Sequence, residues 1–276
     1  RLPEANATRT DGPFATVVRA RDAVRQARRD GGGGPFVIEL RGGLHTLTEP
    51  LTLTPEDSGT AAAPTIFRAY AGERPIISGG RPITGFSETT FNGLHCWRAE
   101  LPQVRAGWRF AQLYARRRGT ATFQRRYRPV KGMLVIAGLT YSPERKASPH
   151  RSAQQDFRFF PGDFKKFANL ADVEVVALHA WSASRLCVES VDLDRNVVRF
   201  TSMPTFRIGH WYRAGRNPYY IENVKEEVRR PGQWYLDTPS GMLYYVRVPG
   251  ETMANTEIVA PFLEQLVKLE GDVSGG

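Results

Sequence analysis

A histidine and a tryptophan two positions apart are the first residues whose types and spacing suit ligand chemistry. His179 and Trp181 share a face if the strand that precedes them continues, and Ser182, Ser184 and Arg185 follow. The apolar face of an aromatic ring matches the C–H face of a pyranose, while polar neighbours bind its hydroxyls. The pattern therefore indicates a sugar platform, with a tryptophan packed in a protein core as the alternative.

Two more aromatic side chains extend this prediction. Trp211 and Tyr212 follow His210 in a loop-like stretch, and loops commonly carry exposed binding residues. The predicted substrate-binding residues are therefore His179, Trp181, Arg185, Trp211 and Tyr212.

Acidic side chains are the second group with chemical potential. Hydrolysis of a glycosidic bond uses two carboxylates, about 5–5.5 Å apart for retention or about 6.5–9.5 Å apart for inversion. The candidates are Asp57, Asp156, Asp163, Asp172, Glu222, Glu226, Glu227 and Asp237. No spacing singles out a pair, so the catalytic residues are unknown from the sequence. Structural roles also explain three of these residues. Asp57 is expected to cap a turn, Glu222 to form a structural hydrogen bond, and Asp237 to form an Asx-type turn.

Several motifs are missing from the sequence, and their absence disfavours classes of chemistry. The five histidines form no H-E-x-x-H pattern or comparable spacing, so we expect no metal site. No G-x-S-x-G elbow, P-loop or dinucleotide fingerprint occurs in the required setting, so we expect no esterase of that type and no cofactor. No run of about 18 apolar residues occurs, so we expect no membrane span.

Positive charge is concentrated in one stretch. The net charge is +10, and the segment 105–131 holds nine basic and no acidic residues, so the rest of the chain stands at +1. Such a stretch can bind phosphates, form a solvated face or pair with an acidic surface. Because no nucleic-acid-binding motif accompanies it, we expect no nucleic-acid partner. The two cysteines, Cys96 and Cys187, form no C-x-x-C pair; we expect free, buried thiols, with a disulfide as the alternative.

The elements that must position these residues change along the chain. Residues 14–29 predict an amphipathic helix with Thr16 as N-cap, ended by Asp30 and a glycine run. Short strands follow, and Val37 and Ile66 head similar runs 29 residues apart. This spacing suits successive coils of a β-solenoid, although a sandwich or meander also fits.

Residues 91–252 have a different pattern, with alternating strands and two predicted hairpins, at 186–200 and 233–246. A solenoid-like strand then returns at 265–271. The predicted domains are the helix and first coils (1–90), an inserted β-rich module (91–252) and a return to the solenoid (253–276). A solenoid that stops as its strands resume lacks a cap, so we expect a fragment of a longer protein.

Several segments along the chain carry a shared pattern: residues 11–16, 19–25, 40–43, 53–60, 67–70, 78–80, 219–223, 231–237, 243–245, and 260–261 with 263–267. Together they resemble large bacterial right-handed parallel β-helix proteins. Among these proteins, the chain resembles glycoside hydrolase family 141 and its relatives. The resemblance implies a mainly β fold: the start of a right-handed parallel β-helix with an N-terminal capping helix and an inserted antiparallel β-rich module.

The same resemblance implies a function. It indicates extracellular or periplasmic hydrolysis of plant or algal polysaccharide, with fucosidase and xylanase activities as examples. The catalytic carboxylates are expected on coils beyond Gly276, so activity is expected of the parent protein and is in doubt for the isolated chain. Two alternatives stay open: a polysaccharide lyase or epimerase, with the basic stretch neutralising acidic sugar, and a noncatalytic glycan-binding module.

Overall fold

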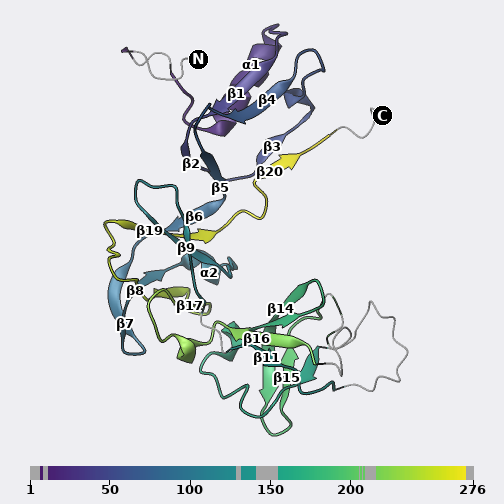
Figure 1. Cartoon of the computed structure of the whole chain (residues 1–276), viewed down its shortest axis with the longest axis vertical. Coiled ribbons are helices and arrows are strands. Elements are labelled where there is room, and N and C mark those ends of the chain that lie inside the picture. Colours follow the sequence, from purple (N-terminus) through teal and green to yellow (C-terminus); the bar gives the residue numbers. More distant parts are fainter. Residues whose placement is uncertain are drawn as a thin grey trace, which may run out of the picture. The chain divides into compact units, whose positions relative to one another are not determined.

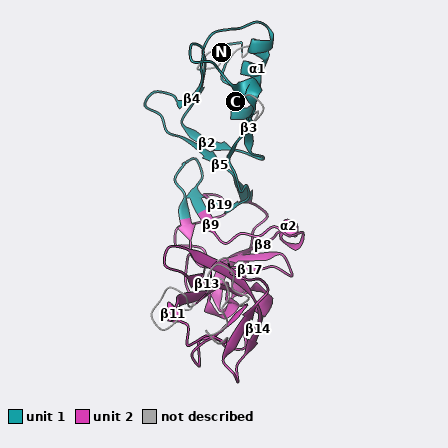
Figure 2. Cartoon of the chain, turned by 90° about the vertical axis from the view of Figure 1, so that its right-hand side faces the viewer, with its two compact units in different colours: residues 1–82, 115–124, 257–276 teal, residues 83–114, 125–256 magenta. Residues whose placement is uncertain are grey.

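The computed structural model describes residues 7–8, 12–128, 132–140, 155–204, 206, 208 and 216–271 (Figure 1). The chain divides into two compact units, coloured separately in Figure 2. Unit 1 comprises residues 1–82, 115–124 and 257–276, and unit 2 comprises residues 83–114 and 125–256. No helix among the described residues is long and apolar enough to cross a membrane.

Helix α1 (Val17–Arg29) opens unit 1, close to its predicted position. The Thr16 hydroxyl accepts a hydrogen bond from the Arg19 backbone N–H at 3.1 Å, which satisfies a free donor of the first turn. The helix ends at Arg29, and two residues later Gly31 has a φ of +90°, a conformation that favours glycine. Partly buried apolar side chains of α1 pack against a small core of Val17, Ile38, Leu40, Leu47 and Leu51.

Short parallel sheets make up much of unit 1. The pairs are β1 (Phe36–Leu40) with β4 (Thr65–Ala69), β2 (Gly43–Thr46) with β5 (Pro75–Ser78), and β3 (Leu51–Leu53) with β20 (Val267–Leu269). A 3-10 turn, η1 (Pro55–Asp57), follows β3. Val37 and Ile66 are parallel partners in the first pair, but their side chains are 44% and 38% exposed. They therefore form no part of the core.

A four-stranded sheet contains the points at which the chain passes between the units. Its order is β10 (Gln124–Arg126), β9 (Leu113–Arg117), β19 (Thr256–Pro261) and β6 (Gly80–Ile83). The unit boundaries, after residues 82, 114, 124 and 256, all fall inside these strands. Neither unit is therefore one continuous segment of chain.

Unit 2 contains an antiparallel four-stranded sheet. Its order is β17 (Trp234–Asp237), β18 (Met242–Tyr245), β8 (Leu94–Glu100) and β7 (Ser87–Phe91), and α2 (Pro102–Arg105) follows β8. Asn92 and Gly93 join β7 to β8 with φ values of +50° and +77°, the left-handed pair that tight hairpins require. The core beside this sheet contains Phe91, Cys96, Val228, Tyr235 and Val246.

A six-stranded sheet forms the rest of unit 2. Its order is β11 (Leu134–Val135), β16 (Pro218–Glu222), β13 (Glu174–Leu178), β14 (Ala183–Asp192), β15 (Val197–Phe200) and β12 (Asp156–Arg158), with neighbours antiparallel. Two 3-10 turns, η2 (Leu170–Asp172) and η4 (Lys225–Glu227), flank β13 and β16. Alternate side chains such as Val175, Ala177 and Leu186 enter a buried core on one face.

The predicted right-handed parallel β-helix is wrong, and with it the predicted role of helix α1 as its cap. The described residues are mainly β, but their sheets are mostly antiparallel. Short strands bounded by turns also arise when neighbouring strands fold back on each other, because antiparallel strands need only a tight turn. The predicted hairpins at 186–200 and 233–246 are confirmed as β14–β15 and β17–β18. The domain bounds 1–90, 91–252 and 253–276 stay a prediction.

Candidate functional site

Two glutamates lie side by side on the face of the six-stranded sheet that is opposite its apolar core. Glu174 on β13 pairs in register with Glu222 on β16 and with Cys187 on β14. Partners in register share a face, and the residues that alternate with them fill the core on the other face. The next row on the face of the two glutamates contains Arg185 and Tyr220.

Two arginines hold both carboxylates. The Nη1 atom of Arg128 donates to Glu174 Oε2 at 2.7 Å and to Glu222 Oε2 at 3.4 Å. The Nη1 atom of Arg185 donates to Glu174 Oε2 at 2.5 Å and also to Glu222. The Arg128 side chain is only 4% exposed and its guanidinium lies 5.1 Å from the centre of the Trp234 ring. The four charges therefore balance in a largely buried cluster.

This cluster is poorly suited to glycosidic hydrolysis. Burial raises the pKa of Glu174, but Arg128 and Arg185 outweigh burial, and the pKa lies below its ordinary value. A general acid needs the opposite shift, because it must hold its proton near neutral pH. Glu174 is thus kept anionic, and the role of the Glu174–Glu222 pair in this arrangement is structural.

Asp172 is the carboxylate with the shift expected of an acid, but it is enclosed. Burial raises its pKa, and the side chain accepts hydrogen bonds from Thr238 N at 3.0 Å and Tyr235 OH at 3.1 Å. Asn169 Nδ2 donates to it and, at 3.2 Å, to Asp237 Oδ1. Because Asp172 is only 4% exposed, its oxygens serve the fold of η2 against the β17–β18 turn.

The remaining predicted carboxylates also have partners within the chain. Asp57 accepts hydrogen bonds from Arg25 Nε and from Thr54 N, both at 2.8 Å, which confirms its turn-capping role. The others pair as follows: Asp156 with Thr140 and Arg199, Asp163 with Phe160 N and Tyr219 OH, Glu226 with Ala168 N, and Glu227 with Arg229. Among the described residues, no group of three or more His, Cys, Asp or Glu side chains could hold a metal ion.

The predicted sugar platform is divided by a turn. β13 ends at Leu178, so His179 and Trp181 do not lie on one strand face as expected. His179 is 5% exposed, and its Nε2 atom contacts Ser184 Oγ at 2.9 Å, whereas Trp181 is 68% exposed. Arg185 lies on the opposite face of β14, in the charged cluster. Trp211 and Tyr212 lie outside the described residues.

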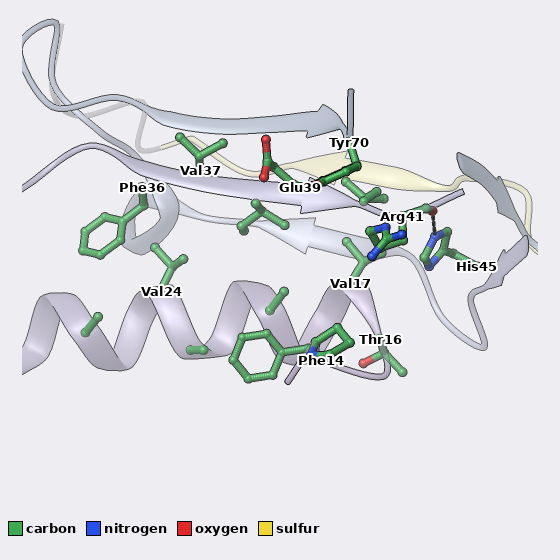
Figure 3. Close-up of a pocket in the computed structure, with 16 residues that line it drawn as sticks. Phe14, Thr16, Val17, Val24, Phe36, Val37, Glu39, Arg41, His45 and Tyr70 are labelled. Atoms are coloured by element: carbon green, nitrogen blue, oxygen red, sulfur yellow. Dashed lines mark hydrogen bonds between the residues drawn. The ribbon is translucent and has the colours of Figure 1, made fainter. Parts of the chain in front are cut away.

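Unit 1 contains a groove that the sequence did not predict (Figure 3). Its volume is about 690 Å³, and helix α1 and strand β1 form its walls. Ala20, Ala23 and Ala27, small residues at helical spacing, were the available signal, because they leave room beside the helix. Most of the lining is apolar, and its polar groups are engaged: Glu39 with Arg68, Arg41 with Glu73, and His45 with the Arg41 carbonyl. The groove suits apolar groups better than a sugar.

Both cysteines are free, as the sequence predicted. Cys96 is buried, but Cys187 is exposed, which corrects the expectation of two buried thiols. The physical reason is strand alternation, because Cys187 faces outward from β14 while Leu186 and Val188 enter the core.

Comparisons with known proteins place the fold. No family model matches the chain. No curated protein matches it either. A solved structure titled "Glycoside hydrolase" is similar, with 24% sequence identity and a TM-score of 0.72 over 95% of this chain. The chain spans about half of that structure's length, 45%. The chain therefore shares its fold with part of a larger protein.

Proposed function

We propose that the chain is part of a carbohydrate-active enzyme, a glycoside hydrolase that acts on plant or algal polysaccharide. The observation that carries the proposal is the fold likeness, which extends over 95% of the chain, to a structure titled "Glycoside hydrolase". Fold alone does not fix chemistry, so the exposed Trp181 ring on unit 2 adds a surface of the kind that binds sugars. Polysaccharides are too large to enter cells, so an extracellular or periplasmic location belongs to the same proposal.

We place the catalytic carboxylates outside the described residues. The predicted acidic candidates are held by arginines, backbone amides or hydroxyls, and Glu174 and Asp172 are largely enclosed. The similar structure has more than half of its length outside the region matched here. The chain then contributes scaffold and substrate contacts, while residues elsewhere in the protein cleave the bond.

The lyase or epimerase alternative receives less support. The sequence argument for this alternative is that the basic stretch 105–131 could neutralise the charge of an acidic sugar. In the structure Arg116 pairs with Glu257, Arg126 with Glu251 and Arg128 with Glu174, so these arginines are already neutralised by the chain's own carboxylates.

The test compares the longer protein encoded around this chain with the 276-residue chain itself. Both are incubated with xylan, xyloglucan, fucan and polygalacturonate, and new reducing ends are measured. We expect the longer protein to release reducing ends from at least one neutral or fucose-containing glycan and the isolated chain to release none. Formation of unsaturated uronates, detected by ultraviolet absorbance, would instead support the lyase. No cleavage of any glycan by the longer protein would refute the proposed hydrolase.

A further inference from the structure

We infer that the β13–β14 turn is a subsite for one unit of a neutral glycan, which stacks on Trp181 and contacts His179 and Ser182 through its hydroxyls. The inference rests on the proposed function and adds to it a place on the molecule and a class of substrate. All of its residues belong to unit 2.

The turn fixes an aromatic ring at the protein surface. The His179 backbone N–H donates to the Ser182 carbonyl at 2.7 Å, which leaves Ala180 and Trp181 at the tip. Trp181 is 68% exposed as a residue, and the Phe206 ring meets its ring edge-on at 6.5 Å between centroids. A short, hydrogen-bonded turn restricts the tryptophan, so that stacking a flat sugar face on it orders little additional chain.

Two buried polar atoms at the base of this turn lack a hydrogen-bond partner among the described residues. Within the part of the chain that the structure describes, His179 Nδ1 and Ser182 Oγ are buried and have no hydrogen-bond partner. The His179 side chain is more than nine-tenths buried, and its other nitrogen is occupied by Ser184. Polar atoms that stay unpaired in this way are rare, because each loses hydration without compensation. Two such atoms beside an exposed tryptophan fit a ligand hydroxyl that enters the turn and both donates and accepts hydrogen bonds.

The chemistry of these groups matches an uncharged hydroxyl. Burial lowers the pKa of His179, so the imidazole is neutral and offers one N–H donor and one acceptor lone pair. The Ser182 hydroxyl can also donate or accept. The nearby charged side chains Glu174 and Arg185 alternate to the opposite face of the hairpin, where they pair with each other. Among the described residues of the turn itself, 179–182, none carries a positive charge that could pair with a uronate carboxylate.

The test measures binding to the intact 276-residue chain by calorimetry. The neutral probes are xylohexaose, cellohexaose and mannohexaose, and the acidic probe is hexagalacturonate. We expect the chain to bind at least one neutral probe more tightly than hexagalacturonate, and Trp181→Ala to weaken that binding about ten-fold or more. Leu193→Ala is the matched control, because Leu193 is a 45% exposed apolar residue at the next hairpin turn of the same sheet. The affinity of Leu193→Ala for the neutral probe should equal that of the wild type.

Ser182→Ala separates recognition from structure. Removal of an unpaired buried oxygen should leave the melting temperature unchanged or raise it, yet affinity for the neutral probe should fall about three-fold or more. In ¹⁵N-histidine spectra, the Nδ1 signal of His179 should shift when the probe is added. If Trp181→Ala and Ser182→Ala both bind the neutral probe as tightly as the wild type, the subsite is overturned. The proposed function would stay intact. Binding of hexagalacturonate that depends on Trp181 would overturn the neutral-sugar assignment. Failure to bind any probe would also overturn the subsite, whereas cleavage by the longer protein tests the proposed function independently.

Discussion

Glu174 and Glu222 lie directly opposite each other on neighbouring strands, and Arg128 Nη1 contacts both carboxylates, at 2.7 and 3.4 Å. Like charges in register repel, so this pairing of β13 with β16 depends on the cations between them. The Arg128 and Glu222 side chains are 4% and 7% exposed. Water therefore cannot replace a missing partner in this cluster.

Replacement of Arg128 by methionine should destabilise the protein strongly. Loss of one partner leaves buried carboxylates uncompensated, and we expect a decrease of about 3 kcal/mol in the free energy of unfolding. Urea denaturation of the full chain measures it. The matched control is Arg199→Met, because Arg199 and Glu189 form a half-exposed pair, 51% and 50%, whose loss should cost about 1 kcal/mol or less. Equal effects of the two substitutions would contradict the structural role given to the cluster.

The stability of the protein should fall in acid, in part through Glu174. Its pKa in the folded protein lies below the ordinary value of 4.5, so the carboxylate contributes stability above pH 4.5. That contribution is lost as the pH falls from about 4.5 through the lower, folded-state pKa. Unfolding free energies between pH 7 and pH 3 should therefore decline less steeply for Glu174→Gln than for the wild type. A slope for Glu174→Gln equal to that of the wild type would refute the assignment.

The two thiols should differ in reactivity. Cys96 is 2% exposed, and burial raises its pKa to about 11, whereas Cys187 is exposed. Because the thiolate is the reactive form, iodoacetamide at pH 8 should modify Cys187 first and Cys96 only when the protein unfolds. Burial by its neighbours also raises the pKa of Cys187, so the reaction should be slower than that of a free thiol.

Mass spectrometry of the modified chain tests this difference. Cys187→Ser should abolish modification of the native protein and leave one reactive thiol in urea. Modification of native Cys96 at the rate of Cys187 would show that the core around β8 is more open than described.

Alanine at Gly59 should destabilise unit 1. A Cβ atom there would lie 2.5 Å from the Ala63 carbonyl oxygen and 2.6 Å from Pro64 Cα, both backbone atoms that cannot rotate away. We expect a loss of about 1–3 kcal/mol in the free energy of unfolding, the usual range for overpacking. Gly33→Ala is the control, because no atom lies within 4 Å of its Cβ position, and its effect should stay within about 0.5 kcal/mol. A similar result for both would contradict the tight 59–65 turn.

Local elements could be predicted from the sequence because their signals lie within a few residues. Thr16 marked the start of α1, and the glycine run after Asp30 marked its end. The turn residues between Asp237 and Met242 predicted the β17–β18 hairpin. The parallel β-helix failed because short strands carry no information about direction: the same apolar runs serve parallel pairs and hairpins.

The site could be predicted only in part, because the pairing register of the strands brings together residues that are far apart in the sequence. Arg128 contacts carboxylates 46 and 94 positions later in the chain, a relationship that no local pattern displays. His179 and Trp181 were recognised by type, but the two-position spacing implied a shared face. The turn after Leu178 reversed that geometry, placing the imidazole inside and the indole outside.

On the ribosome, Leu51 emerges more than 200 residues before Val267, its parallel partner across β3 and β20. At about 5–20 residues per second, the delay lasts roughly 10 to 40 s. Throughout that time the β3 edge is available to any other extended chain nearby. Strand β20, made long after β3, therefore decides whether β3 pairs within its own chain or with a neighbour's.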